Sequence, residues 1–201
     1  MYLDILYTAL LWGIYFFLHS YLASVNCKDW VERNLPRIKK SYRLIYNGIS
    51  VFGLVPILYF LASTSSNFLF EKTTLSKYVA LMLATWGIII VKTAFKTYST
   101  KEFIGINNSY SKSEFVKTGL LKYMRHPIYT GTILITLGFW LFIPSILNLT
   151  TVFCIFIYLV FGIRLEEEKL INEFGEEYEN FQQEVPMLFP SLISLIKRFK
   201  G

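Results

Sequence analysis

The sequence is poor in charged residues, cysteine and histidine. Of its 201 residues only 17% are charged, and 54% are hydrophobic, whereas soluble domains commonly carry about a quarter charged residues. Cys27 and Cys154 do not suggest a disulfide, and together with the two histidines they make no zinc-binding spacing, so no metal is expected. The N-terminus lacks the charged segment and small-residue cleavage site of a signal peptide, which predicts a retained helix.

Long apolar runs take the place of the missing charge. A helix that crosses a membrane needs roughly 20 mostly apolar residues. Five runs approach this length, namely 2–23, 42–62, 75–95, 128–143 and 146–163. Very few residues separate the last two runs, which predicts a tight helical hairpin. The sequence therefore predicts an all-α fold, a polytopic membrane bundle of about five transmembrane helices.

The basic residues indicate how the bundle is oriented. The net charge is +6, and lysine and arginine concentrate in the stretches 25–43 and 92–125 and in the C-terminal tail. The stretch 63–74 and the turn near Pro144 are poor in them. The positive-inside rule then predicts an N-terminus outside and a C-terminus in the cytoplasm. Basic residues in loops between apolar runs indicate contacts with membrane lipid headgroups, not with nucleic acid.

The length of the chain predicts one domain over residues 1–201. Three spans occupy 1–95, a cytoplasmic loop occupies 96–119, and the hairpin and a C-terminal helix occupy 120–201. The loop is long and polar, so either a ligand-binding loop or a solvated connector fits its composition.

The first motif that could carry chemistry is the segment from Arg125 to Gly131. Pro127 suits the first position of a helix, which makes His126 a non-helical residue at its entry. A helix N-terminus attracts anions, and Arg125 adds a positive fork. Tyr129 can share the face of His126, and Gly131 permits close approach of a ligand or of another helix. The alternative is a purely structural helix start at the level of the lipid headgroups.

The second motif is the acidic run after the last span, with Arg164 just before it. We expect a helix that continues to about Gln183. Its apolar residues follow a helical period and are Leu170, Ile171, Phe174, Tyr178 and Phe181. The centre of their face falls near Glu167, with Glu166 and Glu168 to either side. A buried carboxylate at a membrane boundary is a functional candidate, and the alternatives are a structural pair with Arg164 or a solvated acidic run.

The order and spacing of these motifs resemble the isoprenylcysteine carboxyl methyltransferase and phospholipid methyltransferase superfamily. The further parts of the resemblance are Gly119 to Tyr123, Phe174-Gly175 with Tyr178, Val185-Pro186, and Pro190. The segments 19–24 and 42–47 resemble the bacterial branch that contains methanethiol S-methyltransferases and NnrU-like proteins. The resemblance implies an enzyme of the bacterial inner membrane with a cofactor-binding C-terminal part, and the distribution of basic residues predicts that this part and the active site face the cytoplasm.

The resemblance also implies S-adenosylmethionine as methyl donor and a lipophilic or small thiol, carboxylate or amine as acceptor. Residues with the chemistry to bind this donor are Arg125, His126, Tyr129, Gly131, Glu166, Glu167 and Tyr178. The donor carboxylate suits the basic residues and the helix N-terminus, its ammonium and ribose suit the glutamates, and its adenine suits the tyrosines. We expect Glu167 and Arg164 to act in catalysis.

Two other functions fit parts of the sequence. A membrane sterol- or steroid-type reductase that uses NADPH would share the Arg125 to Gly131 pattern, but the chain is short and keeps the Glu166-Glu167 pair. A membrane accessory protein with a decayed motif is the non-enzymatic alternative, and the intact motif residues count against it.

Overall fold

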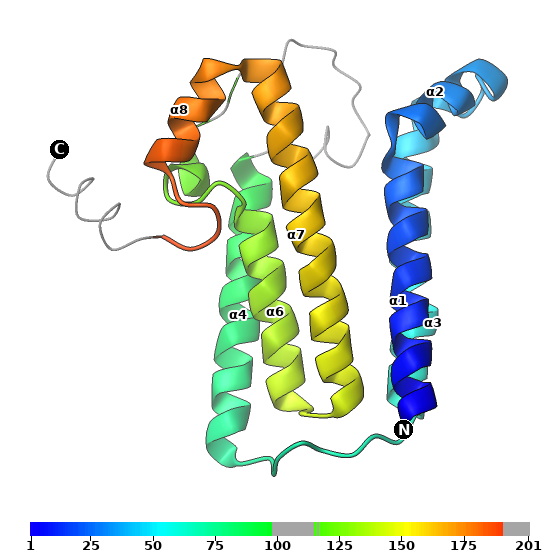
Figure 1. Ribbon diagram of the computed structural model, residues 1–201, viewed down its shortest axis with the longest axis vertical. Coiled ribbons are helices and arrows are strands. Elements are labelled where there is room, and N and C mark those ends of the chain that lie inside the picture. The colour runs from blue at the N-terminus through cyan, green and yellow to red at the C-terminus, as the bar shows by residue number, and fades with distance from the viewer. Residues whose placement is uncertain (98–114, 116, 191–201) are drawn as a thin grey trace, which may run out of the picture. The chain divides into compact units, whose positions relative to one another are not determined.

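The computed structural model describes residues 1–97, 115 and 117–190 (Figure 1). Most of the predicted loop 96–119 lies outside the described residues. The helices are α1 (Tyr2–Ala23), α2 (Val25–Asn34), η1 (Lys39–Ser41), α3 (Tyr42–Ser63), α4 (Thr74–Thr97), η2 (Gly119–Lys122), α6 (Pro127–Phe142), α7 (Ile146–Phe174) and α8 (Glu176–Glu184). Among the described residues the extended structure amounts to one isolated bridge, between Phe68 and Ser145. The predicted all-α class is confirmed.

In the described part of the chain, four helices have the length and composition to cross a membrane, namely α1, α3, α4 and α7. With 16 residues, α6 rises about 24 Å, somewhat less than the roughly 30 Å of a hydrocarbon core. Large apolar side chains point outward along the spans, and Phe52 and Leu75 leave 75% and 72% of their surface exposed. Lipid can cover such surfaces, and helices satisfy their own backbone groups within it. A helical membrane bundle is therefore the fold.

The described residues form two compact units. The first comprises Met1–Glu71 and Pro144–Ile155. In it α1 and α3 lie side by side (Figure 1), and polar contacts join them. The two ring nitrogens of His19 lie 3.0 Å from Ser50 Oγ and 2.9 Å from Tyr46 Oη. Trp12 of α1 also donates a hydrogen bond of 3.0 Å to Thr151 of α7.

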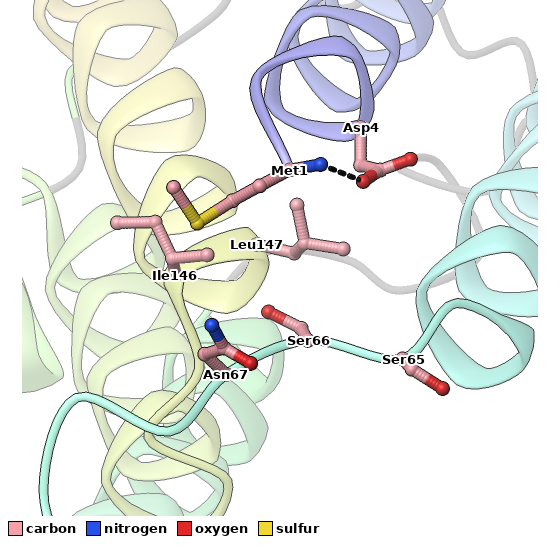
Figure 2. Close-up of a pocket in the computed structure, with 7 residues that line it drawn as sticks. All are labelled: Met1, Asp4, Ser65, Ser66, Asn67, Ile146 and Leu147. Carbon is pink, nitrogen blue, oxygen red and sulfur yellow. Dashed lines mark ion pairs between the residues drawn. The ribbon is translucent and has the colours of Figure 1, made fainter.

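A small open hollow also belongs to the first unit (Figure 2). Its lining residues are Met1, Asp4, Ser65, Ser66, Asn67, Ile146 and Leu147. The Met1 ammonium forms an ion pair with Asp4 at a distance of 2.8 Å. None of the residues of either sequence motif lines this hollow.

The second unit comprises residues 72–97, 115, 117–143 and 156–190. Glycines let α4 and α6 approach closely within it (Figure 1). A Cβ atom on Gly131 would lie 2.7 Å from the Gly87 carbonyl oxygen, and one on Gly138 would lie 2.7 Å from that of Ala80. Real Cβ atoms do not approach so closely, so these positions require glycine as long as the two helices stay in contact.

Two predictions about the helices were wrong. The expected continuous helix to about Gln183 is broken at Gly175, which has φ +56° and lies between α7 and α8. Such a backbone angle ends a helix and favours glycine. The second difference is α2, a helix in part of the stretch 25–43, where the sequence predicts a loop.

Candidate functional site

The first motif lies at the start of α6, and its backbone has the predicted form. His126 precedes the helix with φ −123° and ψ 66°, and Pro127 occupies the first turn. The chain reaches this point through η2, which begins at Gly119 with φ +61°. The buried side chains of Leu121 and Met124 hold this approach in the second unit.

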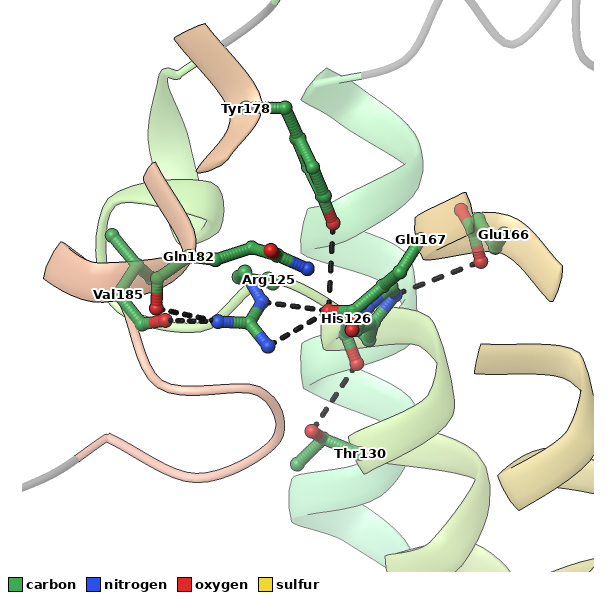
Figure 3. Close-up of polar contacts among 8 residues, drawn as sticks. All are labelled: Arg125, His126, Thr130, Glu166, Glu167, Tyr178, Gln182 and Val185. Carbon is green, nitrogen blue, oxygen red and sulfur yellow. Dashed lines mark hydrogen bonds and ion pairs between the residues drawn. The ribbon is translucent and has the colours of Figure 1, made fainter. Parts of the chain in front are cut away.

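Arg125 uses its guanidinium to join three parts of the second unit (Figure 3). Its Nε and Nη2 each lie 2.8 Å from Glu167 Oε1, the latter as an ion pair. Its Nη1 donates to the carbonyl oxygens of Gln182 at 2.7 Å and Val185 at 2.9 Å. Only 9% of the side chain is exposed. The buried guanidinium thus connects the start of α6 to α7 and to the end of α8.

The segment after α8 covers the start of α6. The backbone N–H groups of Arg125 and His126 donate to the carbonyl oxygens of Pro186 and Met187, each at 3.0 Å. The buried Thr130 hydroxyl donates to Leu188 O at 2.6 Å. These bonds hold 186–188 against the helix entry. The sequence reasoning missed Thr130, and the closing Val-Pro of the family pattern was the one signal that pointed to this segment.

Glu167 is the centre of the polar cluster. Its Oε1 atom also lies 3.1 Å from His126 Nε2 and 3.5 Å from the Tyr178 hydroxyl. Its side chain is 13% exposed and that of Glu166 is 44% exposed, so the predicted inward direction of Glu167 is confirmed. In the described part of the chain, no hydrogen bond or ion pair falls on its second oxygen, Oε2. Oε1 is therefore engaged by Arg125, His126 and Tyr178, whereas Oε2 can accept hydrogen bonds from a ligand.

Glu166 and Tyr129 lie on the other side of His126. The Glu166 carboxylate is 3.6 Å from His126 Nδ1. The rings of His126 and Tyr129 meet edge to face with centroids 5.5 Å apart, which confirms that they share a face. His126 is almost fully buried between the two carboxylates. Both N–H groups of a protonated imidazole would find acceptors here.

An aromatic layer backs the site through Tyr178. The Tyr178 ring is 1% exposed and belongs to a cluster with Phe181 and Val185, against which Phe115 packs. Lys117 lies over the Phe115 ring and pairs with Glu177 at 3.0 Å. Burial, reinforced by the charge of Glu167, raises the pKa of the Tyr178 phenol. The phenol therefore stays neutral and can donate to the carboxylate.

Two site residues sit differently from the rest. Arg164 is exposed, and the cation bound to Glu167 is Arg125 instead. In the part of the chain that the structure describes, Arg164 makes no hydrogen bond or ion pair. Gly131 is buried against Gly87 and Val91 of α4, which favours the approach of another helix over that of a ligand.

The decisive comparison concerns the residues that carry this site. Residues 75–177 match the family model described as Phospholipid methyltransferase. The chain belongs to this family. The match covers both motifs and confirms the family expected from their spacing. The protein is therefore a methyltransferase, which sets aside the reductase and the accessory protein as readings of the sequence.

Curated relatives extend the similarity beyond the family match. A methanethiol S-methyltransferase of Crocosphaera subtropica is 28% identical over 188 residues, which cover 89% of this chain and 71% of that protein. A methanethiol S-methyltransferase of a Pseudomonas species is 28% identical over 196 residues, which cover 94% of this chain and 74% of that protein. The methanethiol S-methyltransferase of Pseudomonas deceptionensis is 35% identical over 115 residues, which cover 53% of this chain and 42% of that protein. No solved structure matches the chain.

Proposed function

We propose that this chain transfers a methyl group from S-adenosylmethionine to a small thiol such as methanethiol, at the cluster around Glu167. The observation that carries the proposal is a buried carboxylate held on one oxygen by Arg125 and His126, with its second oxygen available. The curated relatives named methanethiol S-methyltransferase support the choice of a thiol acceptor.

The chemistry of the side chains fits the proposed donor. Glu167 Oε2 and the exposed Glu166 carboxylate can accept hydrogen bonds from an ammonium group and from ribose hydroxyls. Arg125 is committed to Glu167 and to two backbone carbonyls. The exposed Arg164, one turn before Glu167, is the better candidate for the donor carboxylate.

The donor supplies a methyl group made electrophilic by its positive sulfur, so the protein must mainly align the reacting groups. A small thiol must lose its proton, to Glu167 Oε2 or to water, and the resulting thiolate takes the methyl group as the donor's carbon–sulfur bond breaks. Alignment in a site that excludes water can supply several kcal/mol, up to roughly 10. Arg125 and Tyr178 serve this task by fixing the direction of Glu167. An amine acceptor would also have to lose a proton, for which Glu167 Oε2 is placed as a base.

The proposal includes the setting of the enzyme. We infer that the chain works as one methyltransferase domain in a bacterial inner membrane, with its C-terminus and active site in the cytoplasm. The distribution of basic residues supports this orientation. A water-soluble donor would then reach the site from the side where it is made.

The purified chain with methyl-labelled S-adenosylmethionine and methanethiol tests the function. We expect dimethyl sulfide to form. Glu167→Gln should lower kcat/KM by about a hundredfold or more, because such losses are common when a positioned charge is removed. Glu168→Gln is the matched control, since its carboxylate is exposed and, among the described residues, makes no hydrogen bond or ion pair with the cluster around Glu167. Equal turnover by wild type and Glu167→Gln would reject the assigned site.

Further variants and substrates separate folding, donor and acceptor. Glu166→Gln leaves the Arg125–Glu167 pair intact and should weaken donor binding in equilibrium titrations. A prenylated thiol or carboxylate and a phospholipid amine are the competing acceptors. Turnover of one of these in place of methanethiol would keep the donor assignment and overturn the acceptor. Binding of NADPH without S-adenosylmethionine would overturn both.

A further inference from the structure

Helix α2 joins two membrane-crossing helices but is too short to cross a membrane itself. Its 10 residues rise about 15 Å, against a hydrocarbon core of roughly 30 Å. Only Ser24 separates it from α1, and α3 begins at Tyr42. The chain leaves the bilayer at the end of α1 and enters it again with α3. Residues 24–41 therefore stay at one surface of the membrane.

One face of α2 is fixed to the ends of these two spans. Ser24 caps the helix by accepting a hydrogen bond of 3.2 Å from the Cys27 N–H. Cys27 and Val31 are buried. The Cys27 sulfur lies 3.2 Å from the Tyr42 hydroxyl, which donates to Leu22 O at 2.7 Å. These contacts hold α2 in place and determine which side chains point outward.

The outward side chains combine positive charge with apolar groups. The stretch 25–43 carries six lysines and arginines against two acidic residues. We call its exposed basic side chains the α2 basic surface, which consists of Lys28, Arg33, Arg37, Lys39 and Arg43. Lys39 pairs with Glu32. Trp30 and Leu35 are 56% and 44% exposed. An exposed tryptophan beside basic residues is typical of the membrane–water boundary.

We propose that the α2 basic surface binds the headgroups of anionic phospholipids, with Trp30 inserted at the boundary of the acyl chains. The two neighbouring spans place this surface at the level of lipid phosphates. Arginines can bind a phosphate through two donors at once. The excess of positive charge selects anionic over zwitterionic headgroups. The site is distinct in sequence from the residues around Glu167, and the proposal does not depend on the acceptor.

Tryptophan-sensitised emission tests the proposal with the full-length chain in mixed micelles. The probes are dansyl-labelled phosphatidylglycerol and dansyl-labelled phosphatidylcholine. We expect stronger emission with phosphatidylglycerol, and Trp30→Phe should reduce the difference, because Trp30 is the tryptophan placed among the basic residues. Arg33→Gln with Arg37→Gln should lower the apparent affinity for phosphatidylglycerol by about tenfold or more, since each basic residue near a membrane contributes roughly fivefold. Raising the salt to about 0.5 M should weaken it too.

The matched control is Lys72→Gln with Lys77→Gln, which also removes two exposed charges but lies beyond the far end of α3. Its affinity for phosphatidylglycerol should equal that of the wild type. Circular dichroism should show equal helix content in both double variants. Equal emission with the two lipids would overturn the proposal, as would equal losses in the two double variants. A preference that survives Arg33→Gln with Arg37→Gln unchanged would place the lipid site elsewhere and would overturn it as well.

Discussion

At the residue scale, the position of Glu167 depends on Arg125. A buried carboxylate is costly unless hydrogen bonds and a charge compensate it. Arg125 meets this need with two nitrogens on one oxygen and uses a third nitrogen on backbone carbonyls of Gln182 and Val185. The same side chain therefore orients the carboxylate and ties down the chain after α8.

Arg125→Lys tests this double role. A lysine keeps the charge but cannot reproduce the planar fork. We expect the free energy of unfolding to fall by about 1–3 kcal/mol, because buried acceptors lose their donors, and methyl transfer to fall with it. Thermal unfolding in detergent and a donor-binding titration measure the two effects. Lys122→Gln, an exposed change nearby, should stay within about 0.5 kcal/mol. An equally small effect of Arg125→Lys would show that the fork is dispensable.

Tyr178 gives the site a signature at high pH. Burial raises the pKa of its phenol in the folded chain, whereas an unfolded tyrosine ionises near pH 10. The unfolded chain therefore releases this proton first. The stabilising contribution is complete below about pH 10 and is lost as the pH rises above it.

Tyr178→Phe removes this pH dependence. We expect the stability difference between wild type and Tyr178→Phe to stay constant from about pH 6 to 9. Above about pH 10 it should shift against the wild type by up to about 1.4 kcal/mol per pH unit. Denaturant unfolding at each pH measures it, and Tyr2→Phe, at an exposed tyrosine, is the control. A difference that stays flat to about pH 12 would contradict a raised pKa.

At the scale of elements, the length of each apolar run determined which helices could be predicted from the sequence. The predicted spans 2–23, 42–62 and 75–95 agree with α1, α3 and α4 to within two residues at each end. The break at Gly175 was missed, because the apolar period continues across it while the backbone angle changes. The missed α2 is rich in polar residues, and its formation depends on a Ser24 cap and on two buried side chains.

Close packing of α4 on α6 depends on the glycines at their contact. Gly131→Ala would place a Cβ 2.5 Å from Val91 Cγ2 and 2.7 Å from the Gly87 carbonyl. We expect a loss of about 1–3 kcal/mol in unfolding free energy, typical of overpacking. Gly48→Ala in α3 is the control, since its Cβ would meet no atom within 4 Å, and alanine there should be neutral or slightly stabilising. Equal thermal stability of the two variants would contradict the packing argument.

At the scale of the whole molecule, the two motifs could be predicted as a site, but their internal contacts could not. Residue types and helical spacing placed Glu167 inward and Tyr129 beside His126, as the structure has them. A pair of Glu167 with its sequence neighbour Arg164 is one alternative that the sequence offers, whereas the structure pairs Glu167 with Arg125, 42 residues away. Backbone acceptors such as Pro186 O leave no pattern in a sequence, because every residue carries a carbonyl.

The orientation of the chain decides whether a cytoplasmic methyl donor can reach Glu167, and two exposed positions test it. In a variant with Cys27→Ser and Cys154→Ala, we expect a membrane-impermeant maleimide to label Ser65→Cys on intact cells. Glu176→Cys, next to the site on α8, should react only after permeabilisation. Both residues are exposed, so a difference reports sidedness and not burial. The reverse pattern would place the site outside the cytoplasm, where a donor made inside the cell could not supply it, and would remove the basis of the proposed reaction.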